Sequence, residues 1–75
     1  MPNLALLDQL EASLPLIVAR DQVERLTGGA VTRGTLARLD HEGQGPKERI
    51  RVGRKVAYSS ASFMEWLRGR TVELL

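Results

Sequence analysis

The sequence predicts a small α+β fold that is mostly α-helical, and three observations support this prediction. Apolar residues recur at helical spacing in the stretches 3–14, 20–27, 33–42 and 59–69. Only residues 49–58, RIRVGRKVAY, alternate apolar and charged side chains as a β-strand does. Turn-forming residues separate the stretches, at Pro15, Gly28 and Pro46. We therefore expect helices, one two-stranded hairpin and a last helix that caps the fold.

The length and composition exclude several classes of protein. A chain of 75 residues forms one modest core and leaves no room for a cleft between domains. With no Cys and one His, it makes no disulfide and no thiolate metal site. Glu42 and Glu48 have neither a nucleophile nor a phosphate-binding loop near them in the sequence, so we expect no enzyme, no cofactor and no small-molecule substrate.

The N-terminal residues 1–15 predict an amphipathic helix that Asn3 caps and Pro15 ends. Asp8 and Glu11 stand where a signal peptide would need basic and then purely apolar residues, so we expect a cytoplasmic protein without a membrane segment. The sequence leaves open whether this helix packs on the core or joins two copies of the chain. Its apolar side is formed by Leu4, Leu7, Leu10 and Leu14.

A main domain is expected over residues 16–69, followed by a short tail, 70–75. Leu16 to Val18 is long enough only for an edge strand or an extended lead-in. The helix over 20–27 begins after Ala19, which offers no capping oxygen, and ends at Gly28 and Gly29. Thr32 is the expected cap of the next helix, 33–42.

The helix over 33–42 has two different faces. Leu36 and Leu39 point to one side, which we expect to be buried. The opposite side is small and polar, and it is formed by Gly34, Ala37, Arg38 and His41. In the last helix, which Ser59 or Ser60 caps, the spacing of Phe63, Trp66 and Leu67 assigns those three side chains to the core.

The register of the hairpin is predicted from its apolar residues. A three-residue loop, Gly53 to Lys55, places Val52 opposite Val56 and Ile50 opposite Tyr58, so that all four share one buried face. A two-residue loop would divide them between both faces. The longer loop is therefore expected, with Arg49 and Arg51 on the outer face.

Basic residues are concentrated in and around the hairpin, which predicts a polyanionic partner. Between Pro46 and Tyr58 the only acid is Glu48. A polar helix with small residues near its start fits the DNA major groove, and a cationic hairpin reaches phosphates or the adjacent minor groove. We expect double-stranded DNA as the partner; a merely solvated basic surface is the alternative. The candidate DNA-binding residues are Arg33, Gly34, Thr35, Arg38, His41, Lys47, Arg49, Arg51, Arg54 and Lys55.

Three segments together resemble a known family: LIVARDQVERLTGG, VTRGTLARLDHEGQGP and RIRVGRKVAYSSASFMEWL. They are similar to the winged helix-turn-helix of the excisionase and MerR-like family, whose wing is followed by a helix with a Leu-x-x-Trp-Leu pattern. Here that pattern is Phe63 to Leu67, ending in Trp66 and Leu67. The link TGGAVT is longer than the family's usual LGVS.

The resemblance implies a winged helix-turn-helix over 16–69, with the recognition helix 33–42 in the major groove and the wing 49–58 beside it. It implies a phage or prophage excisionase, which acts in recombination with an integrase or recombinase and has no catalytic activity of its own. A small transcriptional regulator and a terminase small-subunit domain for DNA packaging are the alternatives. A different class, a protein-interaction adaptor, would use Leu4, Leu7 and Leu10 as an exposed docking stripe.

Overall fold

The computed structural model describes residues 5–72 and 74, and its fold is α+β with more helix than strand. The described residues form four α-helices, one short 3₁₀-helix and a three-stranded antiparallel sheet with the strand order β1-β3-β2. The predicted α+β class is confirmed, and helix exceeds strand, although only about half of the chain is helical. The elements are α1 (Ala5–Ser13), β1 (Ile17–Ala19), η1 (Arg20–Gln22), α2 (Val23–Leu26), α3 (Arg33–His41), β2 (Arg49–Val52), β3 (Lys55–Ser59) and α4 (Ser60–Gly69).

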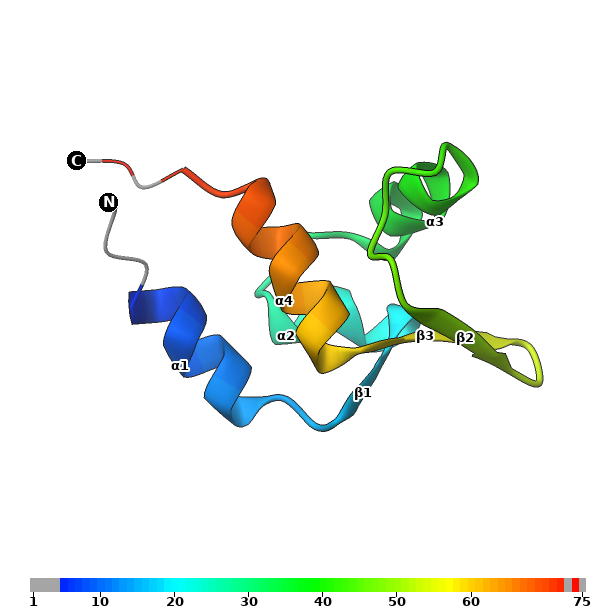
Figure 1. Ribbon diagram of the computed structural model, residues 1–75, viewed down its shortest axis with the longest axis horizontal. Helices are drawn as coiled ribbons and strands as arrows, with labels where there is room; N and C mark the ends of the chain where they lie inside the picture. The colour runs from blue at the N-terminus through cyan, green and yellow to red at the C-terminus, as the bar shows by residue number, and fades with distance from the viewer. Residues whose placement is uncertain (1–4, 73, 75) are drawn as a thin grey trace.

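The two terminal helices pack together at one end of the molecule, and the β2-β3 hairpin extends at the other (Figure 1). Leu7 and Leu10 of α1, and Leu14 just after it, are half-buried and pack against the core, whereas Leu6 is exposed. Two ion pairs of 2.8 Å join Arg68 of α4 to Asp8 and Glu11 of α1. The predicted cap Asn3 and the apolar Leu4 lie outside the described residues.

Local capping chemistry sets where the helices begin. The Thr32 hydroxyl accepts a hydrogen bond from the Thr35 amide at 3.2 Å, and the Ser59 hydroxyl accepts one from the Ser62 amide at 3.1 Å. Both predicted caps are confirmed. Ala19 has no capping oxygen, and the helix after it begins with a 3₁₀ turn, η1, before α2.

The long link between α2 and α3 is an ordered turn. Gly28 and Gly29 adopt φ angles of 62° and 89°, a region that favours glycine. The Thr27 hydroxyl donates to the Val23 carbonyl at 2.8 Å and accepts from the Val31 amide at 3.1 Å. The turn therefore closes on its own hydrogen bonds and places Val31 in the core.

The core lies between the sheet, α2, α3 and α4. As predicted, Leu36 and Leu39 of α3 and Phe63 of α4 are buried. Trp66 and Leu67 are only partly buried and pack against the edge of the core. The other buried members of this cluster are Val18, Val23, Val31, Tyr58 and Met64.

The predicted hairpin register is wrong. The structure has a two-residue turn, Gly53 and Arg54, so that Val52 pairs with Lys55 and Arg49 pairs with Tyr58. Gly53 has a φ of 62° and Arg54 does not have a positive φ, which is the pattern of the type II′ turn favoured in two-residue hairpins. The short edge strand β1 pairs with β3, so the sheet has one strand more than the predicted hairpin.

The observed register places the arginines of β2, rather than its apolar residues, on the inner face of the sheet, where Arg49 can pair with Asp40. Cross-strand partners share a face, so Arg49 and Arg51 lie on the face of Tyr58 and Val56. Ile50 and Val52 occupy the opposite face and remain 46% and 64% exposed. Of the three strands, only β1 and β3 contribute apolar side chains to the core, and Arg49 of β2 gains a carboxylate partner, Asp40.

The register is tested by a pair of matched substitutions. Val56→Thr places a hydroxyl on the half-buried inner face and is expected to lower the free energy of unfolding by at least about 1 kcal/mol. Val52→Thr, on the exposed outer face, is expected to change it by less than about 0.5 kcal/mol. Urea unfolding followed by circular dichroism measures both. Equal losses in the two variants would favour the three-residue loop instead.

Candidate nucleic-acid interface

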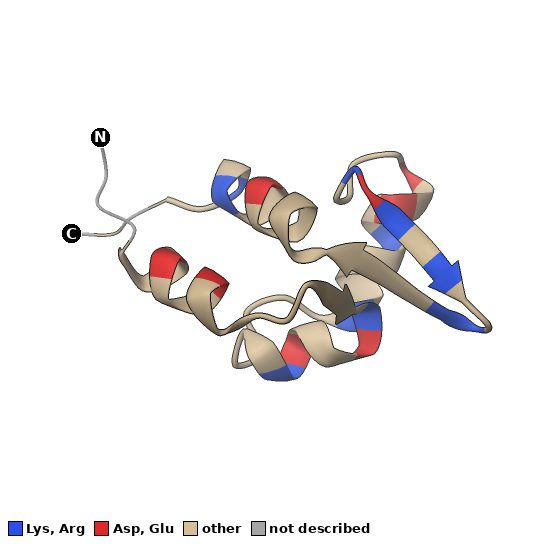
Figure 2. Cartoon of the chain, turned by 60° about the horizontal axis from the view of Figure 1, so that its bottom comes forward, with Lys and Arg blue, Asp and Glu red and all other residues tan. Residues whose placement is uncertain are grey.

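The inner face of the hairpin and one side of α3 enclose a groove, which we call the α3–hairpin groove. It consists of two adjacent hollows that share Arg20, Ala37 and Val56. Figure 2 shows basic residues along the hairpin and residues of both charges on the neighbouring helices, whereas the charged residues of α1 are acidic. The groove is lined by Arg20, Asp21, Arg33, Gly34, Ala37, Asp40, His41, Arg49, Arg51, Arg54, Lys55 and Val56, and it is also bordered by Ile50, although the side chain of Ile50 belongs to the outer face of the hairpin.

The helix wall of the groove is low because its residues are small. A Cβ atom added to Gly34 would meet nothing within 4 Å, and Ala37 contributes only a methyl group. Arg33 and His41 stand at the two ends of this wall and are exposed. A ligand can therefore approach the backbone of α3 closely between the side chains of Arg33 and His41.

The hairpin wall carries most of the positive charge. Arg51 faces α3 because of the observed register, and Arg54 extends from the turn. Neither makes an ion pair with any residue that the structure describes. Lys55 pairs with Asp21 of the groove rim, and its hydrogen bond lowers the pKa of that carboxyl group. Six cationic side chains and two carboxylates thus line a groove that attracts anions.

At the floor of the groove lies a buried carboxylate that the sequence analysis did not single out, that of Asp40. The residue is 7% exposed, and its Oδ2 accepts hydrogen bonds of 2.5 Å from Arg20 Nη2 and from Tyr58 Oη. Its Oδ1 accepts from Arg49 Nη1 at 3.3 Å, and Arg20 Nε donates to Tyr58 Oη at 2.9 Å. A signal existed in the sequence: Asp40 follows Leu36 by four residues and so falls on the buried face of α3.

Both partners of the Asp40 Oδ2 atom keep their protons at neutral pH. Burial raises the pKa of the Tyr58 hydroxyl to about 12. For Arg20, burial by itself would lower the pKa, but the hydrogen bonds to Tyr58 and Asp40 outweigh it and raise the pKa. Tyr58 therefore acts as a donor to Asp40 and an acceptor from Arg20 at the same time.

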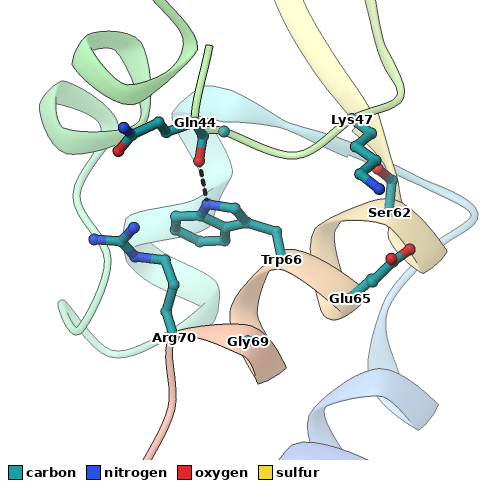
Figure 3. Close-up of a pocket in the computed structure, with 8 residues that line it drawn as sticks. Gln44, Lys47, Ser62, Glu65, Trp66, Gly69 and Arg70 are labelled. Carbon is teal, nitrogen blue, oxygen red and sulfur yellow. Dashed lines mark hydrogen bonds between the residues drawn. The ribbon is translucent and has the colours of Figure 1, made fainter. Parts of the chain in front are cut away.

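The loop after α3 is shaped around the same carboxylate. A Cβ atom on Gly45 would lie 1.9 Å from Asp40 Oδ1, so only glycine fits there. The neighbouring Gln44 carbonyl accepts a hydrogen bond of 2.9 Å from Trp66 Nε1 of α4 (Figure 3). The Arg70 guanidinium lies over the ring of the same Trp66, 5.5 Å from its centroid. Trp66 thus fixes the loop that closes behind Asp40.

Most of the predicted site residues meet in the groove, but three do not. The Thr35 hydroxyl accepts from the Thr32 hydroxyl at 2.9 Å, beside the cap of α3, and does not line the groove. Arg38 lies outside it and pairs with Glu42 at 3.3 Å on the exposed surface. The predicted residues that line the groove are Arg33, Gly34, His41, Arg49, Arg51, Arg54 and Lys55.

Lys47 is the third predicted residue outside the groove. It lines a separate hollow together with Ser62, Glu65 and Trp66, where α4 meets the loop (Figure 3). The groove also contains Arg20, which was not among the predicted site residues.

Among the described residues, no helix is long and apolar enough to cross a membrane. A comparison of the chain with protein-family models, with curated proteins and with solved structures finds no match. The function of the groove is therefore inferred from its geometry and charge.

The hydrogen bonds around Asp40 predict that the protein loses stability at alkaline pH when Tyr58, the only tyrosine of the chain, is deprotonated. Its pKa is about 12 in the fold, above the ordinary value of 10.0, so the stability that it contributes is complete below pH 10 and is lost as the pH rises toward 12. Phenolate absorbance of the native and the urea-unfolded chain measures the two pKa values. A native pKa equal to the unfolded one would contradict the hydrogen-bonded position of Tyr58.

The close contact at Gly45 is tested against a second glycine. Gly45→Ala is expected to lower the free energy of unfolding by about 2 kcal/mol, because its methyl group displaces the Asp40 carboxylate. Gly34→Ala, in open space on α3, is expected to leave it unchanged or raise it by up to about 1 kcal/mol. Urea unfolding of both variants provides the measurement, and equal stability of the two would contradict the contact.

Proposed function

We propose that this protein binds double-stranded DNA with the α3–hairpin groove, as a winged helix-turn-helix without catalytic activity. In this proposal α2 and α3 are the helix-turn-helix, α3 is the recognition helix and the β2-β3 hairpin is the wing. The observation that carries the proposal is the register of the hairpin, which turns Arg49 and Arg51 toward the helix wall at Ala37 and His41. The cations of the hairpin wall match the phosphate backbone of DNA, and the low, polar helix wall matches the neighbouring major groove of the duplex.

The ion pair at the rim of the groove does not oppose this use. The side chains of Lys55 and Asp21 are 69% and 23% exposed, and those of the pair outside the groove, Arg38 and Glu42, are 60% and 44% exposed. Exposed pairs of this kind contribute about 0 to 1 kcal/mol each. A DNA phosphate can therefore replace the carboxylate at little cost in free energy.

Arg33, Arg51 and Arg54 then have distinct roles. Arg33 lies in the first turn of α3, where it reaches a guanine edge or a phosphate. Arg51 and Arg54 lie on the wing and contact phosphates or the adjacent minor groove, which gives affinity without sequence preference. Sequence preference would come from the exposed helix face, including His41.

The resemblance to excisionases extends the proposal to a biological role. We propose that the protein acts as an excisionase-like factor of a phage or prophage, together with an integrase or recombinase. Footprinting on DNA next to the gene tests this role. Adjacent direct repeats beside an attachment site would support it, whereas a single palindrome at a promoter would assign the protein to transcriptional regulation.

DNA binding itself is tested with two substitutions that remove the same charge from different faces. Arg51→Ala is expected to weaken binding to a mixed-sequence duplex about tenfold and to reduce the slope of log K against log salt by about one. Lys47→Ala, on the separate hollow, is expected to change both only slightly. Fluorescence anisotropy titrations at several salt concentrations measure the two quantities.

The same titration decides against the proposal in either of two ways. Absence of binding by the unmodified protein at low salt would exclude a DNA-binding function. Equal losses for Arg51→Ala and Lys47→Ala would show that net charge, rather than the α3–hairpin groove, determines the affinity.

A further inference from the structure

The Asp40 carboxylate holds two arginines that both line the α3–hairpin groove. Arg20 comes from η1 and Arg49 from β2, and they reach the same carboxylate at 2.5 Å and 3.3 Å. Both also border the same hollow, beside Ala37 and His41 of α3. One buried group on the recognition helix thus determines where two cations from other elements stand.

Both arginines keep N–H donors that are not engaged by Asp40 or Tyr58. A guanidinium group has five N–H donors, of which Arg20 directs Nε and Nη2 to Tyr58 and Asp40, and Arg49 directs Nη1 to Asp40. The remaining donors have no side-chain acceptor among the residues that the structure describes. The side chains of Arg20 and Arg49 are 22% and 44% exposed and line the groove, so both are partly accessible to a ligand there.

We propose that Asp40 is a positioning residue for DNA binding, which orients Arg20 and Arg49 so that both donate to a phosphodiester group of the DNA backbone in the groove. This inference rests on the proposed function and adds Arg20 to its contacts. Without the carboxylate, the two guanidinium groups would repel each other and lose their common anchor. Because long flexible side chains lose conformational freedom on binding, arginines that are already held in place bind a phosphate more tightly.

The direction in which Asp40→Asn changes the affinity for DNA distinguishes positioning of the arginines from long-range electrostatic attraction. Asp40→Asn removes a negative charge from the groove, and long-range attraction alone would then tighten binding to a polyanion. Positioning predicts the opposite, because asparagine is a weaker anchor for the two guanidinium groups. Asp21→Asn is the matched control: it removes the same charge from the same groove, but its partner is Lys55 at the rim.

The experiment compares these two variants with the unmodified protein by anisotropy titration against one mixed-sequence duplex at low salt. Asp40→Asn is expected to weaken binding at least about fivefold, and Asp21→Asn to leave it unchanged or to tighten it. Tighter or unchanged binding by folded Asp40→Asn would overturn the inference while leaving the proposed function intact. Absence of binding by the unmodified protein would instead overturn the proposed function, and the inference with it.

A second variant covers the case in which Asp40→Asn does not fold. Tyr58→Phe keeps every charge and removes only the hydroxyl that accepts from Arg20 and donates to Asp40, while the direct pair between Arg20 and Asp40 remains. In the folded variant, the loss of affinity is expected to be about twofold to fivefold and to be non-additive with Arg20→Ala, but additive with Arg54→Ala. A merely structural role would weaken binding equally in both backgrounds. An unchanged affinity, or additivity with both substitutions, would overturn the inference.

Discussion

The structure depends on how one buried carboxylate is satisfied. A buried charge is destabilising unless it is paired and hydrogen-bonded, and the donors to Asp40 come from η1, β2 and β3. The hairpin cannot move away from α3 without leaving that charge incompletely paired. The width of the α3–hairpin groove is therefore determined by the reach of Arg20, Arg49 and Tyr58, and the absent side chain of Gly45 leaves room for the carboxylate.

The helices could be predicted from the sequence because their causes are local. Thr32 and Ser59 cap helices with hydroxyls that act three residues away, and Leu36 is buried because of its place in the period of α3. The sheet could not be predicted in the same way. The pairing of β1 with β3 joins Val18 to Tyr58, which are separated by about half of the chain, and no short pattern encodes it.

The error in the hairpin register has a specific physical cause. The prediction assumed that apolar side chains decide which face is buried, and it placed Ile50 and Val52 inside. The structure shows that a polar partner can decide instead, because Arg49 of β2 reaches Asp40 when the turn has two residues. Asp40 on the apolar face of α3 was the visible sign of such a partner.

The candidate site was predictable in composition but not in arrangement. The high density of basic residues in the sequence indicated the hairpin as part of the site, and Arg51, Arg54 and Lys55 of the hairpin do line the groove. That density could not show that Lys47, only two residues before Arg49, lies at a different hollow next to Trp66. It also could not show Arg20, because a residue that is distant in sequence enters the groove only through the sheet and η1.

The same contacts link the stability of the hairpin to its proposed use. Every residue of β2 is exposed, so this strand is held by its ladder with β3 and by the pair between Arg49 and Asp40 rather than by burial of Ile50 or Val52. A phosphate that enters the groove can share the donors of Arg49, but it cannot replace Asp40, whose other oxygen also satisfies Tyr58 and Arg20. An anionic ligand therefore adds to the network without dismantling it, so the groove can keep its shape when it is occupied.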